Sequence, residues 1–172
     1  MGTASHKFEA QPGLMTSATD FAELYEQHYA AVYKSALRIT GNPADAEDVL
    51  QTVFLRVLNQ GGRLDPAQLP QAYFRRASAN AAVDLLRRRA SHGESRLHGE
   101  SLCVAVENDA LLKERLRRAI ATLEQIDAVL FLLRHVEGLS NGELAEMFSL
   151  EKNSVAVRLH RIRQTLQTEM ER

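Results

Sequence analysis

The chain reads SNGELAEMFSLEKNSVAVRLHRI from Ser140 to Ile162, and this stretch predicts two helices joined by a tight turn. Ser140 and Glu143 have the spacing of a capping box, in which each side chain accepts a hydrogen bond from the other residue's backbone amide. Apolar residues follow at helical spacing, and the spacing is interrupted between Phe148 and Val155. This is the pattern of a helix-turn-helix, whose second helix can enter the major groove of DNA.

The second helix of this pair is predicted to turn polar and basic side chains outward. Arginine and asparagine can read base edges or hold phosphates, and small apolar side chains can touch thymine methyl groups. An ordinary helical hairpin with a charged, solvated face would have the same spacing, so that alternative stays open. The outward face comprises Asn153, Ala156, Val157, His160 and Arg161, with Arg158 and Arg163 beside it.

Upstream of this stretch the chain also reads as helix, with no sustained alternation typical of strands. Asn42 and Pro43 suit the cap and the first position of a helix, and Gly61 ends it. A capping-box spacing at Asp20 starts the helix before it. Further helices are expected over residues 71–89, 108–122 and 125–136. The chain is therefore predicted to be all-α.

Composition limits the class of protein. The 172 residues are 45% hydrophobic and 25% charged, which is ordinary for a globular chain. No apolar run approaches the roughly 20 residues that span a bilayer, and residues 1–19 lack the apolar core of a secretory signal. Cys103 is the single cysteine, which excludes an intrachain disulfide and fits a reducing compartment. We therefore expect a cytoplasmic protein.

Enzymatic motifs are missing from the sequence. There is no glycine-rich phosphate loop and no zinc-binding helix motif. His92, His98 and Cys103 lie near one another, but their spacing matches no metal site. We expect no enzyme, no cofactor and no metal.

Charge is unevenly distributed along a chain whose formal net charge is only −1. Residues 20–60 carry three basic and six acidic side chains, whereas residues 61–98 carry seven basic and three acidic ones. This asymmetry indicates different partners for different surfaces.

Two sets of segments carry a family resemblance. Segments 136–140 (VEGLS), 143–146 (ELAE), 154–155 (SV) and 158–161 (RLHR) resemble region 4, the promoter-binding domain of bacterial sigma factors. Segments 21–33, 45–51 (DAEDVLQ), 53–55 (VFL) and 73–89 are similar to region 2. The subgroup that keeps only these two regions is the extracytoplasmic-function group of the sigma-70 family. Two matched blocks in the right order are more specific than either block alone.

The resemblance implies two small helical domains. A flexible N-terminal tail would cover residues 1–19, a region 2 helical bundle residues 20–89, a flexible linker residues 90–109, and a region 4 helix-turn-helix residues 110–172. The implied partners are core RNA polymerase, promoter DNA and an anti-sigma factor, often membrane-bound. No separate dimerisation segment is present, so we expect a monomer when free. The alternative is a helix-turn-helix regulator or a sigma-like interaction module that acts without core polymerase.

The resemblance also assigns roles to residues. The second helix would bind polymerase through an acidic outer face, although a solvated acidic face with one stray leucine is the plainer interpretation. The third helix would bind the minus-10 element, and the loop over residues 61–70 would receive a flipped base. The residues that bind polymerase would be Asp45, Glu47, Asp48, Gln51, Thr52 and Leu55. The residues that bind the minus-10 element would be Arg75, Arg76, Asn80, Val83, Arg87 and Arg88. The residues that bind the minus-35 element would be Asn153, Ser154, Ala156, Val157, Arg158, His160 and Arg161.

Overall fold

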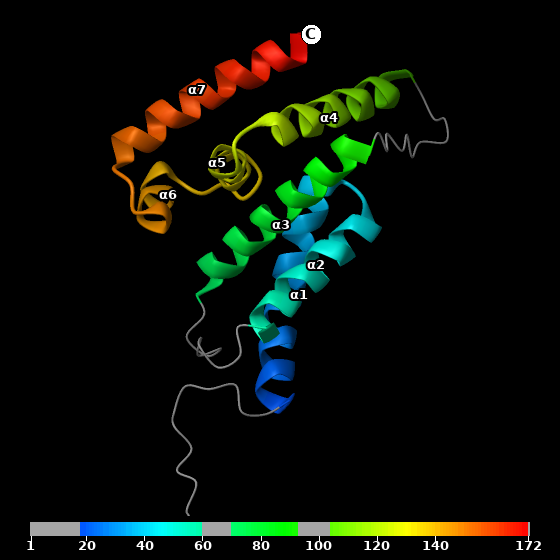
Figure 1. Ribbon diagram of the computed structural model, residues 1–172, viewed down its shortest axis with the longest axis vertical. Helices are drawn as coiled ribbons and strands as arrows, with labels where there is room; N and C mark the ends of the chain where they lie inside the picture. The colour runs from blue at the N-terminus through cyan, green and yellow to red at the C-terminus, as the bar shows by residue number, and fades with distance from the viewer. Residues whose placement is uncertain (1–17, 60–69, 93–103, 172) are drawn as a thin grey trace, which may run out of the picture.

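The computed structural model describes residues 18–59, 70–92 and 104–171. These residues form seven α-helices and no strand, which confirms the predicted all-α fold (Figure 1). The helices are α1 (Ala18–Thr40), α2 (Pro43–Asn59), α3 (Gln71–His92), α4 (Val104–Thr122), α5 (Gln125–His135), α6 (Asn141–Phe148) and α7 (Lys152–Glu171). We call α1–α3 the N-terminal module and α4–α7 the C-terminal module.

Several helix boundaries follow the predicted signals. The Asn42 side chain caps α2, since its Oδ1 accepts the backbone amide of Ala44 at 2.8 Å. Gly41, at φ 69°, adopts the left-handed conformation that ends α1 and that glycine tolerates best. The predicted start of the first helix was wrong. Helix α1 begins before Asp20, so Asp20 does not cap it.

Both ends of the predicted linker over residues 90–109 are helical. Helix α3 continues to His92, and α4 already begins at Val104. Residues 1–17 of the expected tail, residues 61–69 of the expected loop and residues 93–103 of the expected linker lie outside the described residues, as does Cys103.

The core of the N-terminal module forms where the three helices meet around Phe74, which is 1% exposed. The His28 ring stacks on Phe74 with 4.1 Å between ring centroids. Burial lowers the pKa of His28, which favours the neutral ring in this apolar setting. The predicted inner positions Val49, Val53 and Val57 of α2 are buried as expected.

The helix-turn-helix lies in the C-terminal module and confirms the prediction from residues 140–162. The capping box is complete: the Glu143 amide donates to Ser140 Oγ at 3.2 Å, and the Ser140 amide donates to Glu143 Oε2 at 2.8 Å. That amide lowers the pKa of the Glu143 carboxyl, because it stabilises the ionised form. Ser149 turns the chain at φ 53°, and Val155 and Ile162 bury the inner face of α7.

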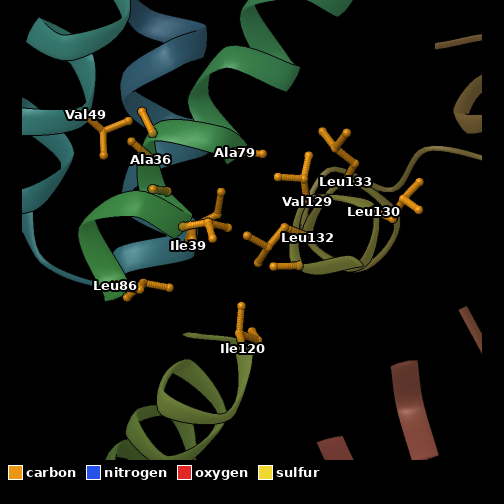
Figure 2. Packing of buried hydrophobic residues seen from close by; sticks show 14 of the residues in the cluster. Ala36, Ile39, Val49, Ala79, Leu86, Ile120, Val129, Leu130, Leu132 and Leu133 are labelled. Carbon is orange, nitrogen blue, oxygen red and sulfur yellow. The ribbon is translucent and has the colours of Figure 1, made fainter. Parts of the chain in front are cut away.

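Helix α3 is buried on two sides. It packs against α1 and α2 on one side and against α4 and α5 on the other (Figure 1). Figure 2 shows Ala79 of α3 close to Val129 of α5, with Ile39, Leu132 and Ile120 gathered at the same seam. The buried residues of both modules therefore form one hydrophobic cluster.

We predict that Ser140→Ala lowers the free energy of unfolding by about 1 kcal/mol, because the first turn of α6 loses its side-chain acceptor. Chemical denaturation of the two proteins measures the difference. Thr168→Ala is the control, since Thr168 is exposed and its hydroxyl only bonds a carbonyl within α7. Equal losses in the two variants would contradict a specific role of the capping box.

Candidate protein and nucleic-acid interfaces

The outer side of α2 is an exposed acidic face formed by Glu47, Asp48, Gln51 and Leu55. Leu55 is 55% exposed, which leaves a large apolar side chain in water on the same side of α2 as the two carboxylates. Thr52, also predicted here, is half-buried, and its hydroxyl donates to the Asp48 carbonyl at 2.8 Å.

Asp45 does not belong to the acidic face, and its predicted outward position was wrong. The side chain is buried, 3% of the residue is exposed, and its Oδ1 accepts a hydrogen bond from Arg89 of α3. Burial raises the pKa of the Asp45 carboxyl, while Arg89 lowers it. The sequence could not show this, because the partner arginine lies 44 positions away.

An aromatic extension of the acidic face was missed by the sequence analysis. Tyr25 and Tyr29 of α1 stack with 5.6 Å between ring centroids, and Tyr25 lies 4.7 Å from the ring of Phe54 in α2. Tyr29 and Leu58 are 46% and 43% exposed. The four-residue spacing of Tyr25 and Tyr29 on α1 was the available signal, but it resembled the edge of a core stripe.

The outward side of α7 forms the recognition face. Its predicted residues Asn153, Ser154, Ala156, Val157, His160 and Arg161 are all exposed. Arg158 differs, because it is half-buried and its Nε donates to the Asp127 carboxylate of α5. Asp127 was not predicted. The outward positions are confirmed, whereas contact of these residues with DNA stays a prediction.

The side of α3 predicted to bind the minus-10 element is covered by the C-terminal module. Val83 is 0% exposed, so its predicted outward position was wrong, and Ala79 of the same helix is also 0% exposed. Gln125 donates to the Asn80 side-chain oxygen at 3.3 Å. Arg87 donates to the Ala121 carbonyl at 3.3 Å, and also to the Leu123 carbonyl and the Gln125 side chain.

Two further arginines connect the modules at the rim of this seam. Arg76 donates to the Met147 carbonyl at 3.1 Å, and its guanidinium lies 4.4 Å from the centroid of the Phe148 ring. Arg38 of α1 donates to the Val136 carbonyl at 3.5 Å. Of the remaining predicted residues, Arg75 is half-buried and Arg88 is exposed.

Within the described parts of the chain, no group of histidine, cysteine and carboxylate side chains is arranged to hold a metal. His92 instead contacts the Arg88 carbonyl at 2.6 Å. None of the described helices is long and apolar enough to cross a membrane.

Comparisons with known proteins match each module separately. Residues 24–92 match the family described as Sigma-70 region 2, and residues 113–166 match Sigma-70, region 4. Among curated relatives, the ECF RNA polymerase sigma factor SigE of Mycolicibacterium smegmatis is 29% identical over 95% of this chain, which spans 66% of its length. The RNA polymerase sigma factor CarQ of Myxococcus xanthus is 28% identical, with 82% of this chain and 83% of CarQ covered.

A solved structure shares the fold. CnrH in complex with the cytosolic domain of CnrY has a TM-score of 0.54 and 20% sequence identity, covering 91% of this chain and 90% of that one. The two modules thus recur together in another chain of similar length.

We predict that Arg87→Ala loosens the packing between the modules. It removes the donor for three part-buried acceptors, and a buried acceptor left without a donor costs about 1–3 kcal/mol. Small-angle X-ray scattering should give a larger radius of gyration, and amides near residues 121–125 should exchange faster. Arg88→Ala removes an exposed arginine at the next position and should change neither. Equal compactness of the two variants would contradict the role of Arg87.

Proposed function

Because this chain belongs to the sigma-70 family of RNA polymerase sigma factors, in its extracytoplasmic-function group, we propose that it binds core RNA polymerase and directs promoter recognition, strand opening and transcription initiation. Its work is recognition rather than covalent chemistry. The modules correspond to region 2, expected over residues 20–89, and region 4, expected over residues 110–172. We place the protein in the bacterial cytoplasm, where polymerase and promoter DNA are found.

One observation carries this proposal: both sigma regions occur in order on one chain, each with its own exposed polar surface. The acidic face of α2, which includes the exposed Leu55, docks on polymerase, and the exposed Tyr25 and Tyr29 of α1 extend it. The recognition face of α7 reads the minus-35 element in duplex DNA. Because the two faces lie on different modules, both can be engaged at once.

Binding of the minus-10 strand requires the modules to separate. Asn80 is bonded to the first residue of α5 and Arg87 to the last turn of α4, so the same groups cannot hold DNA in this arrangement. Val83 reaches solvent only when α3 leaves the C-terminal module. The described arrangement is thus a closed form, and binding to polymerase supplies the free energy that opens it.

An anti-sigma factor is the partner that would favour this closed form. CnrH, whose fold this chain shares, was solved with a bound partner, the cytosolic domain of CnrY. A protein that binds the closed form better than the open one shifts the population toward the closed form. Such a partner would keep the minus-10 residues of α3 covered.

The direct test mixes the purified chain with purified bacterial core polymerase and transcribes a randomised promoter pool. Binding to core, together with enrichment of promoters that contain two conserved blocks, is the expected result. A folded chain that binds no core would favour instead a helix-turn-helix regulator or an interaction module that acts without polymerase.

We predict that the double variant Asp48→Arg, Leu55→Glu weakens binding to core polymerase at least about tenfold, since it reverses one charge and removes the exposed apolar contact. Asp45→Asn is the control: Asp45 is three positions away but buried, so core affinity should stay unchanged. Surface plasmon resonance measures both. Loss of affinity in Asp45→Asn alone would place the polymerase surface elsewhere.

For the recognition face, we predict that Arg161→Ala lowers initiation from minus-35-dependent promoters about tenfold and leaves core binding unchanged. Arg163→Ala is the control, because Arg163 is also exposed on α7 but lines a hollow on its other side with Phe131 and Leu166. Transcription assays at several salt concentrations separate the two roles of an arginine. Loss of a phosphate contact reduces the salt dependence of binding, whereas loss of a base contact relaxes the sequence preference.

A further inference from the structure

We propose that Asp127 is a positioning residue for promoter recognition, because it holds the Arg158 guanidinium against the edge of the recognition face. This inference rests on the proposed function and concerns the same surface of the C-terminal module. Arg158 alone would be a long, mobile side chain at the side of α7. Asp127 gives it one orientation before DNA arrives.

The geometry of the pair supports this role. Asp127 lies in the first turn of α5, and Arg158 lies in α7, so the ion pair joins two helices. The side chains are 25% and 34% exposed respectively, which places the pair at the surface and within reach of a ligand. Both residues line an open hollow of about 520 Å³ together with Asn153, Ser154, Val157 and Arg161. The pair therefore borders the residues predicted to read DNA.

The chemistry of the contact leaves the guanidinium free to bind. Arg158 uses its Nε–H for the carboxylate. An arginine has five N–H donors in a fixed planar fork, so four donors on the terminal nitrogens remain for a phosphate or a guanine edge. Holding the side chain in place beforehand reduces the conformational entropy that is lost on binding. The charge of Asp127 would itself repel phosphates, so its contribution to binding depends on Arg158.

A purely structural role predicts different behaviour. If the ion pair only joined α5 to α7, its loss would lower the stability of the module and weaken all promoters alike. A positioning role changes base preference or the salt dependence of binding while stability is retained. Measurements of both quantities therefore distinguish the two roles.

The experiment uses the full chain bound to core polymerase and compares wild type with Asp127→Asn, which keeps the shape of the side chain and removes its charge. We expect about tenfold weaker initiation from minus-35-dependent promoters and a broader base preference at one minus-35 position in the randomised pool. Core affinity and the melting temperature should be unchanged. The control is Glu124→Gln, which removes an exposed charge at the N-cap of the same helix, where the side chain makes no capping bond.

A double-mutant cycle completes the test. If Asp127 acts through Arg158, then Asp127→Asn should cause no further loss of initiation in an Arg158→Ala background. Unchanged promoter selection by Asp127→Asn, an equal effect in both backgrounds, or a lower melting temperature with unaltered base preference would each overturn the inference. A wild-type chain that binds no core would instead remove the proposed function, and the inference with it.

Discussion

The burial of α3 on two opposite sides is the constraint on which the rest of the structure depends. A helix buried this way needs apolar residues around most of its circumference. Helix α3 meets this need with small side chains, since Ala79, Ala81 and Ala82 are buried together with Val83 and Leu86. Alanines let neighbouring helices approach closely, so one helix can complete the core of the N-terminal module and also pack against α4 and α5 (Figure 2).

The polar rim of the seam follows one chemical rule. The last carbonyls of a helix have no partner within that helix and must find donors elsewhere. Arginines of the N-terminal module supply these donors. Arg87 donates to a carbonyl at the end of α4, Arg38 to one at the end of α5, and Arg76 to one at the end of α6. Guanidinium groups suit this position, because they bind carbonyls here and, under the proposed function, would bind phosphates if DNA replaced those carbonyls.

The replacement of helix carbonyls by DNA phosphates as arginine partners would connect the closed form to the proposed function. The seam covers the side of α3 that would hold the opened strand, whereas the acidic face of α2 and the recognition face of α7 stay exposed. Polymerase and the minus-35 element can therefore make first contact without any rearrangement. Under the proposed function, the minus-10 strand would gain access only after the modules part, so strand capture would follow docking.

Local signals in the sequence determined most of the helices and the outward residues of α7. The capping box at Ser140, the Asn42 cap and the apolar spacing of α7 act within a few residues, so the helix-turn-helix and its outward residues were predictable. Contacts between distant positions were not predictable from the sequence. Asp45 was expected on the outer face of α2, but it is buried and bonded to Arg89 of α3. Val83 and Asn80 were expected to face solvent, but α5 covers them, and Asp127 gave no sign of its bond to Arg158. Periodicity tells which residues of a helix share a side; only the packing of the other helices decides how many of its sides are buried.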